Sequence, residues 1–300
     1  MEKSNQLELK GIMPPIATPF INNEIAFDKL SENISKWNKT GLSGYVVFGS
    51  NGESAFLTRE EKLKLIEAVK KYKSVDKKLI AGTGSDSIKE TIALSNEAAK
   101  RGADAALILT PSYYKSQMKG EAFIKYFTAV ADKITIPILI YNVPKFTGVS
   151  IEPETVARLS EHPNIIGIKN SDENIAHLSE IIHLTPKNFI TIVGTASILY
   201  AGLCAGAVGG ILALANIAPD ECVRMVALFI QGKLDEAKNL QMTLLAANKA
   251  VTAKYGVPGL KAAMDITGYF GGMPRLPLSP ISAEQKQELI SILKKSQILD

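Results

Sequence analysis

The sequence predicts an α/β fold: a (β/α)8 barrel, also called a TIM barrel, with a C-terminal helical extension. Short apolar, β-branched runs recur along the first two-thirds of the 300 residues, and helix-like stretches separate them. Continuous apolar strands that alternate with helices are typical of a parallel sheet covered on both faces. Eight such units fit a closed barrel better than an open doubly wound sheet, which usually has fewer strands.

Each predicted strand is a short apolar run bounded by turn residues. The eight runs are 12–20, 44–49, 78–84, 105–111, 137–144, 165–171, 189–195 and 208–214. No G-x-G-x-x-G motif follows the first run. Dinucleotide binding therefore has little support.

The stretches between the strands predict amphipathic helices, because apolar residues recur at i, i+3, i+4 and i+7 opposite a charged face. The clearest are 59–72, 87–102 and 121–134. Thr58 and Glu61 have the spacing of a capping box at the start of the first of these helices. Gly102 stands where a C-cap would end the second.

The strand pattern stops at Pro219. The remainder, through Asp300, is predicted to form helices around an irregular stretch at 268–280, and no low-complexity linker precedes it. We therefore predict a catalytic barrel at 1–218 and a helical extension at 219–300 packed on it.

Composition narrows the function classes. Hydrophobic residues make up 46% and charged residues 21% of the chain, as in globular proteins with a large core. The net charge of +4 comes from scattered lysines, which argues against a nucleic-acid partner. No run approaches the ~20 apolar residues of a membrane span, and the start lacks a signal core. Cys204 and Cys222 lie in apolar contexts, which predicts reduced, buried thiols and a cytoplasmic location.

Polar residues gather at the predicted strand ends, where barrel enzymes place their active sites. Ser50 follows the second strand, Tyr113 the fourth, Tyr141 lies at the end of the fifth, and Lys169 ends the apolar run of the sixth. A buried ammonium is costly unless it is paired or neutralised. Lys169 therefore either turns out to solvent or has a chemical role, and the barrel rule favours a role.

Four motifs on these strand ends carry a resemblance to a known family. They are GSNGES (49–54), TPSYY (110–114), YNVPKFTG (141–148) and GIKNS (167–171). In this order and spacing the chain resembles, over essentially its whole length, the dihydrodipicolinate synthase/N-acetylneuraminate lyase superfamily of Schiff-base aldolases. The match is expected to be closest to the 4-hydroxy-2-oxoglutarate aldolases, since GSNGE stands where the synthases carry GTTGE.

The resemblance implies an imine between Lys169 and the C2 carbonyl of a 2-oxo acid. A lysine amine attacks a ketone only in its neutral form, which burial favours. Tyr141 would shuttle protons, and Ser50 would link it to Tyr113 of a neighbouring subunit. This implies at least a dimer, and we expect a homotetramer, a dimer of dimers.

No metal and no separate cofactor is needed for imine chemistry. The three histidines show no metal-ligand spacing and are expected to lie on the surface; they are His162, His177 and His183.

Substrate-binding residues are expected in the turn after the second strand. Gly49 and Gly52 permit positive φ and close approach, so the amides of Ser50 and Asn51 can converge on a carboxylate. Three further positions are expected in the site. Ser171 supplies a hydroxyl two residues past the lysine, and Gly194 and Ile211 belong to the site by resemblance alone.

The predicted reaction is cleavage of 4-hydroxy-2-oxoglutarate to pyruvate and glyoxylate. Phe146 stands where the synthases carry an arginine, and Lys145 beside it is no bidentate equivalent. Two enzymatic alternatives remain: 4-hydroxy-tetrahydrodipicolinate (dihydrodipicolinate) synthase, which condenses pyruvate with aspartate semialdehyde, and a 2-keto-3-deoxy sugar acid aldolase. A barrel that binds a 2-oxo acid without catalysis is disfavoured, because binding alone needs neither Lys169 nor Tyr141.

Overall fold

A closed parallel barrel forms the centre of the structure, a computed structural model that describes residues 7 and 9–300. Eight parallel strands lie in the order β1-β10-β9-β8-β7-β6-β5-β4. A bridge between Pro15 and Val46 joins the two ends of this sheet. The strands are β1 (Gly11–Met13), β4 (Gly44–Val47), β5 (Lys78–Gly82), β6 (Ala105–Leu109), β7 (Ile138–Asn142), β8 (Ile165–Asn170), β9 (Ile190–Val193) and β10 (Gly209–Ile211). The (β/α)8 prediction is confirmed.

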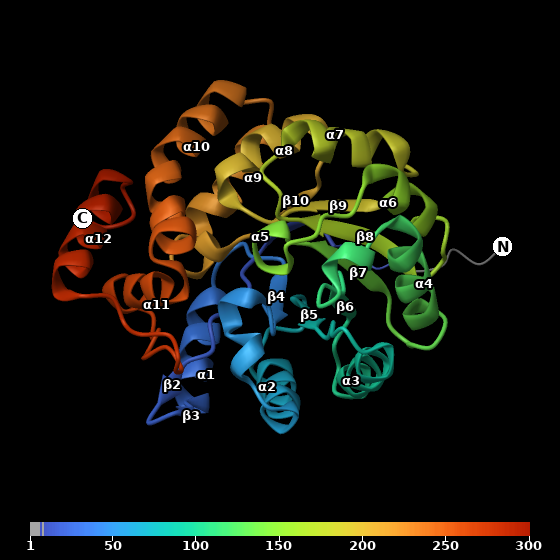
Figure 1. The fold of residues 1–300 in the computed structure, drawn as a ribbon. Helices are drawn as coiled ribbons and strands as arrows, with labels where there is room; N and C mark the ends of the chain where they lie inside the picture. Colours follow the sequence, from blue (N-terminus) through green and yellow to red (C-terminus); the bar gives the residue numbers. More distant parts are fainter. Residues whose placement is uncertain (1–6, 8) are drawn as a thin grey trace.

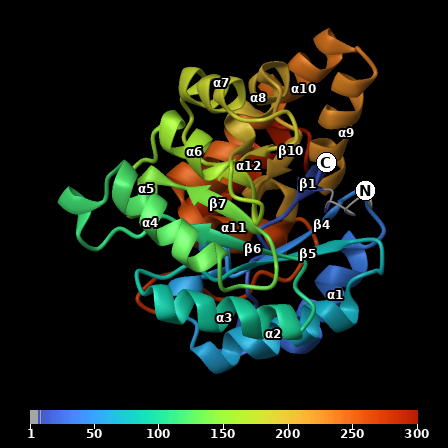
Figure 2. The same ribbon diagram turned by 90° about the vertical axis from the view of Figure 1, so that its right-hand side faces the viewer.

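Helices surround the strands, as Figures 1 and 2 show from two directions. Those that follow the strands along the chain are α1 (Phe27–Trp37), α2 (Arg59–Tyr72), α3 (Ile88–Lys100), α4 (Gly120–Ala131), α5 (Pro144–Thr147), α6 (Pro153–Leu159), α7 (Ile175–Leu184), α8 (Leu199–Ala205) and α9 (Pro219–Ile230). The C-terminal ones are α10 (Leu234–Lys249), which continues into a π-helical turn at Ala250–Lys254, then α11 (Gly256–Ile266) and α12 (Ala283–Lys295).

The local helix signals are confirmed. Thr58 and Glu61 form both hydrogen bonds of the capping box at the start of α2. Gly102 follows α3 with a φ of +92°, a value that glycine adopts readily.

The first strand is much shorter than the predicted 12–20. After β1 the chain continues extended to β2 (Phe20–Ile21), which pairs antiparallel with β3 (Glu24–Ile25) in a separate hairpin. Three prolines cause the break, because proline has no N–H to donate to a strand ladder. They are Pro14, Pro15 and Pro19.

Side chains alternate between the inside and the outside of the barrel. The interior cluster includes Leu107, Leu139 and Ile192. The neighbouring positions Ile108 and Ile140 belong instead to a cluster with residues of α4 and α6. The same alternation puts Tyr141 of β7 in the interior cluster, with Lys169 of β8 as its register partner.

The C-terminal helices pack on one side of the barrel, next to α1 and the β2–β3 hairpin (Figure 1). The last barrel strand is followed by α9, which contacts β1 and α8. This is where a barrel helix would lie, so the division at 218/219 stays a prediction.

Two expectations about side-chain exposure are wrong in part, one for the cysteines and one for the histidines. Cys222 is buried, but Cys204 is exposed. His183 is exposed, whereas His162 and His177 are partly buried. The Nε2 of His177 is hydrogen-bonded to the carbonyl oxygen of Ile151, 3.1 Å away. Whether such a side chain is buried depends on how the neighbouring helices pack against it. Sequence periodicity alone does not show this packing.

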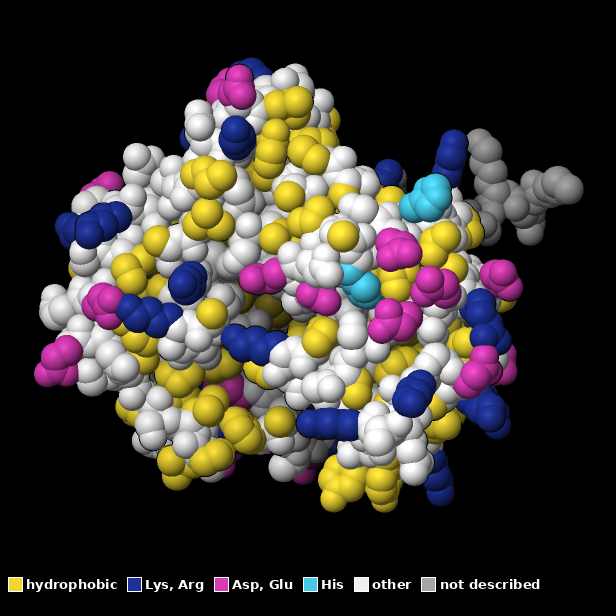
Figure 3. Space-filling view, turned by 45° about the horizontal axis from the view of Figure 1, so that its top comes forward, with side chains coloured by type: hydrophobic (Ala, Val, Ile, Leu, Met, Phe, Trp, Pro, Cys, Tyr) yellow, Lys and Arg dark blue, Asp and Glu magenta, His cyan; other side chains and the backbone are white. Residues whose placement is uncertain are grey.

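Charged and apolar side chains are mixed on one face of the molecule (Figure 3). On the face drawn in Figure 3, Lys and Arg side chains are interspersed with Asp and Glu instead of forming one continuous basic patch. In the part of the chain that the structure describes, no helix combines the length and apolar character needed to cross a membrane. The cytoplasmic location stays a prediction.

Candidate active site

Lys169 and Tyr141 lie side by side inside the C-terminal end of the barrel. They are register partners on the adjacent parallel strands β8 and β7. Lys169 is 2% exposed and Tyr141 7%. The Nζ of Lys169 lies 4.1 Å from the centroid of the Tyr141 ring. The alternative in which this lysine turns out to solvent is therefore wrong.

The surroundings of Tyr141 favour its phenolate. Burial by itself raises the pKa of this phenol, because it disfavours the charged form. The positive charge of Lys169 and hydrogen bonding from Ser50, Lys169 and Ser171 act in the opposite direction. The balance holds the pKa of Tyr141 below its ordinary value of 10.0. A buried phenol with this bias can accept and return protons.

The GSNGE turn is built differently from the expectation. Gly49 has a φ of −69°. Positive φ lies instead at Phe48 (59°) and Glu53 (57°), so the expectation of a left-handed glycine is wrong at both Gly49 and Gly52. Close approach is the reason for glycine at Gly52, where a Cβ would lie 2.9 Å from the carbonyl oxygen of Ile16.

The turn nevertheless begins with two amides that have no acceptor within it. Ser50 and Asn51 are the first two residues of the 3-10 turn η1 (Ser50–Gly52). First-turn amides have no acceptor within their own helix. The internal bonds begin with the amide of Gly52, which donates to Gly49. The amides of Ser50 and Asn51 are thus suited to an external acceptor such as a carboxylate.

Ser171 and Gly194 touch across the ends of β8 and β9. A Cβ on Gly194 would lie 1.9 Å from the Ser171 Oγ, so only glycine leaves room for this serine. The Gly194 amide donates to the carbonyl of Asn170 at 2.7 Å. The loop after β9 is therefore held against the lysine strand.

A buried pair of asparagines locks β7 to β8, and sequence reasoning missed it. The Nδ2 of Asn142 donates to the Oδ1 of Asn170 at 2.8 Å. Both are 0% exposed and directly follow Tyr141 and Lys169. The sequence did offer a signal for this pair, because the two asparagines stand at equivalent positions of two predicted strands. A buried amide needs a hydrogen-bond partner, and each could supply one to the other.

Ile211 and Tyr113 occupy opposite environments, one in the barrel interior and one on the surface. Ile211 is fully buried in the interior cluster that also contains Tyr141. Tyr113 is 79% exposed, and its ring packs edge-on against Tyr114 at a centroid distance of 5.1 Å. Its backbone amide donates to Asp86 at 3.0 Å. Within one chain the structure does not bring Tyr113 to Tyr141.

No three His, Cys, Asp or Glu side chains lie close enough to hold a metal ion among residues 7 and 9–300. The expectation of a reaction without metal or cofactor stays a prediction. What the described site offers is an amine, a phenol, two hydroxyls and free amides, which suit imine formation with a small oxo acid.

Comparisons with known proteins agree with this geometry. Residues 8–296 match the dihydrodipicolinate synthetase family. The 4-hydroxy-tetrahydrodipicolinate synthase of Methanothrix thermoacetophila is 39% identical over 288 residues, which cover 95% of this chain and 96% of that protein. A crystal structure of dihydrodipicolinate synthase is 37% identical with a TM-score of 0.91, covering 97% of this chain and 100% of that one.

A third relative was solved with a small oxo acid. It is a prophage protein of the dihydrodipicolinic acid synthase family from E. coli, in complex with pyruvate. It is 29% identical with a TM-score of 0.91, and the match covers 96% of this chain and 99% of that one.

The superfamily expectation is thereby confirmed, whereas the expected kinship with 4-hydroxy-2-oxoglutarate aldolases is corrected. The relatives above carry the synthase name or the synthase family name. The match to the family model spans nearly the whole chain. The chain belongs to the dihydrodipicolinate synthetase family, whose members are carbon–carbon lyases that form a Schiff base.

Proposed function

We propose that this protein condenses pyruvate with aspartate semialdehyde, the reaction of a 4-hydroxy-tetrahydrodipicolinate synthase. The observation that carries the proposal is the buried Lys169 amine 4.1 Å from the ring centroid of Tyr141. The synthase name of the relatives supports the choice of reaction.

In this proposal the neutral Lys169 amine attacks the C2 carbonyl of pyruvate. The carbinolamine loses water to give a protonated imine, which withdraws electrons from the neighbouring carbon. Loss of a C3 proton then gives an enamine that attacks the aldehyde carbon of the second substrate. Each step moves a proton, and Tyr141 is positioned beside the amine to accept and return it.

The pyruvate carboxylate is assigned to the amides of Ser50 and Asn51. These amides have no acceptor within the turn, and a charged acceptor makes the stronger kind of hydrogen bond. Ser171 lies beside the imine position and hydrogen-bonds with Tyr141. It therefore connects the proton-transfer group to the lysine strand.

One observation favours a second candidate, the cleavage of 4-hydroxy-2-oxoglutarate or of a 2-keto-3-deoxy sugar acid. Phe146 lies in α5, directly after the Tyr141 strand, and is 64% exposed. The Nζ of Lys145 lies 5.9 Å from the centroid of that ring, and 3.4 Å from the carbonyl oxygen of Thr252. An apolar ring thus stands where the family resemblance expects an arginine, which weakens the case for a second substrate held by a guanidinium.

Assembly is part of the proposal. Tyr113 and Tyr114 are 79% and 68% exposed, an unusual state for two adjacent aromatic rings. We assign them to a contact with a second copy of the chain, in which Tyr113 completes the proton relay through Ser50. A homotetramer built as a dimer of such dimers is the expected assembly.

Two assays test the reaction. Borohydride with pyruvate should trap a covalent adduct on the peptide that contains Lys169, and Lys169→Met should abolish the adduct. Values of kcat/KM are then compared for condensation with aspartate semialdehyde and for pyruvate release from 4-hydroxy-2-oxoglutarate and keto-deoxy sugar acids. Condensation should be fastest. A faster release reaction would transfer the assignment to the second candidate, and an untrapped wild-type protein would remove the imine mechanism.

A further inference from the structure

A buried ion pair connects the GSNGE turn to the C-terminal helices. The Oε1 of Glu53 lies 2.6 Å from the Nζ of Lys261 in α11, and the two side chains are 0% and 1% exposed. The other carboxylate oxygen, Oε2, accepts the backbone amide of Arg275 at 2.7 Å. Lys261 also donates to the carbonyl of Met273 at 2.8 Å. One carboxylate thus holds both α11 and the segment that follows it.

The backbone at Glu53 needs this support. Its φ of 57° lies in the left-handed region, which is unfavourable for a residue with a side chain. The residue ends η1, whose first two amides are the proposed carboxylate site. A residue in such a conformation persists only where its surroundings enforce it. The ion pair with Lys261 and the Arg275 amide are the contacts that do so from outside the turn.

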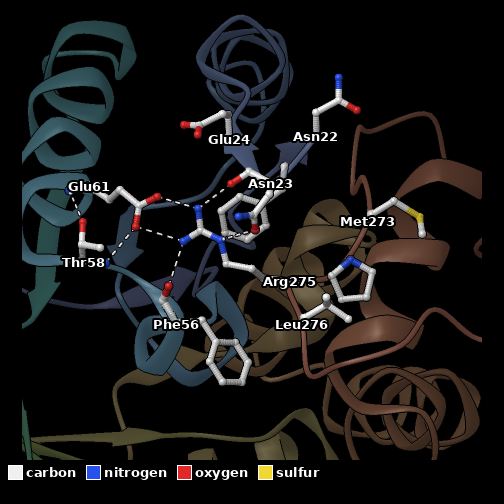
Figure 4. Close-up of a pocket in the computed structure, with 11 residues that line it drawn as sticks. Asn22, Asn23, Glu24, Phe56, Thr58, Glu61, Met273, Arg275 and Leu276 are labelled. Carbon is white, nitrogen blue, oxygen red and sulfur yellow. Dashed lines mark hydrogen bonds and ion pairs between the residues drawn. The ribbon is translucent and has the colours of Figure 1, made fainter.

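A second ion pair anchors the same segment further out, as Figure 4 shows. The guanidinium of Arg275 binds Glu61 through two bonds, of 2.9 Å from Nη1 and 2.5 Å from Nη2. It also donates to the carbonyl of Phe56 at 2.8 Å and to Asn23. The surrounding cavity has a volume of about 800 Å³, but these partners occupy the guanidinium. Arg275 is therefore an anchor for the segment and not an anion site.

Both cations share one aromatic ring. The Nζ of Lys261 and the Cζ of Arg275 each lie 4.4 Å from the centroid of Phe20. Cations at this distance from a ring are attracted by its negative face. Phe20 thus holds the C-terminal segment to the chain between β1 and α1, next to the turn. Its own backbone is bridged to Gly272.

We propose that Glu53 and Lys261 are positioning residues for substrate binding: their ion pair sets the orientation of the Ser50 and Asn51 amides. The C-terminal helices are then a functional part of the active site, although none of their residues touches the reacting atoms. The inference rests on the proposed function, because it takes these amides as the pyruvate carboxylate site.

The test measures the pyruvate concentration that gives half-maximal borohydride trapping. Glu53→Gln keeps the size of the side chain and its acceptor for the Arg275 amide but removes the charge that holds Lys261. We expect this concentration to rise about tenfold, the effect of weakening one charge-assisted hydrogen bond to the carboxylate. The trapping rate at saturating pyruvate should stay within about threefold of wild type, because only binding is weakened.

Lys261→Met leaves Glu53 buried without a counter-charge and is the variant most at risk of not folding. The double variant, with Glu53→Gln and Lys261→Met together, has no uncompensated charge. It is measured instead if Lys261→Met does not fold. Lys77→Met is the matched control. Lys77 is 8% exposed and donates to the carbonyls of Leu42 and Thr40, at the opposite end of the barrel. Its removal should lower thermal stability without changing the half-maximal concentration.

The outcomes separate the two proposals. A wild-type protein that traps no pyruvate removes the proposed function and this inference together. A wild-type protein that traps pyruvate, with folded Glu53→Gln and double variants of unchanged half-maximal concentration, overturns only the inference. A rise shared equally by Lys77→Met would also overturn it, because general destabilisation would then be the cause.

Discussion

The barrel interior and the C-terminal segment each bury a lysine, and they compensate its charge differently. Lys261 is paired with a carboxylate 2.6 Å away. Lys169 has no carboxylate partner among residues 7 and 9–300. Its Nζ lies 4.1 Å from the centroid of the Tyr141 ring, and the two side chains are hydrogen-bonded. Burial lowers the pKa of Lys261 below its ordinary value, and the Glu53 carboxylate acts in the opposite direction. A phenol matches the charge only after losing its own proton.

This difference distinguishes a lysine paired with an anion from the lysine that we propose as the nucleophile. A carboxylate beside a buried ammonium favours the charged form of the lysine. Attack on a carbonyl needs a neutral amine, so a reactive lysine is better placed away from a fixed anion. The predictions below test this distinction.

The largest effect is expected from Lys169→Met. Turnover should fall by roughly four to six orders of magnitude, as when a covalent nucleophile is removed from other enzymes. Mass spectrometry after borohydride treatment with pyruvate should show no adduct. Lys77→Met, which removes a lysine from the other end of the barrel, should keep the adduct. An adduct in Lys169→Met protein would mean that a different amine reacts.

Tyr141→Phe should have the next largest effect. Removing the phenol should slow turnover by about two to four orders of magnitude, the usual contribution of general acid–base catalysis. The adduct should still form, because the amine remains. Stopped-flow and steady-state rates on the same preparation check both points. Near-wild-type turnover would assign the proton transfers to another group.

Tyr113→Phe should reduce turnover less, by roughly ten- to a hundredfold, since it removes only the outer member of the proposed relay. If Tyr113 acts in the neighbouring subunit, mixed oligomers with Lys169→Met should regain activity, because some sites then contain both intact groups. Activity is measured after the two variants are unfolded and refolded together, and is compared with that of each variant alone. No recovery in confirmed mixed oligomers would place Tyr113 outside the site.

The smallest effect is a shift in titration. Lys169 lowers the pKa of Tyr141 by its charge and by hydrogen bonding, against the effect of burial. Lys169→Met removes this contribution, so the pKa of Tyr141 should rise and less phenolate should be present at any given pH. Ultraviolet absorbance of tyrosinate follows this change. Tyr126, whose pKa burial raises to about 12, is an internal control that should not move. An unchanged titration of Tyr141 would show that the two groups are not coupled.

Local sequence patterns were sufficient for the barrel and for the strand-end positions of Tyr141 and Lys169. The apolar run 165–171 contains the strand β8, and helix signals such as the Thr58 capping box act within one turn. Tyr141 and Lys169 each stand at the end of such a run. The barrel rule then places both at one end of the molecule.

The patterns were insufficient where prolines or distant contacts intervene. The first strand ends early because Pro14 and Pro15 interrupt its hydrogen bonding. In the turn, left-handed φ falls on Glu53 and not on Gly49. The Glu53 side chain contacts Lys261 and the amide of Arg275, which lie far along the chain and carried no local signal.

The sequence by itself determined the alternation of strands and helices, the lysine and tyrosine at their strand ends, and the family. These follow from short-range periodicity and from residue identity. Only the tertiary structure decided that Tyr141 and Lys169 are register partners, that Asn142 bonds Asn170, and that Glu53 is paired with Lys261. Such contacts join residues that are distant in the chain, and their geometry is set by packing of the whole barrel and not by local preference.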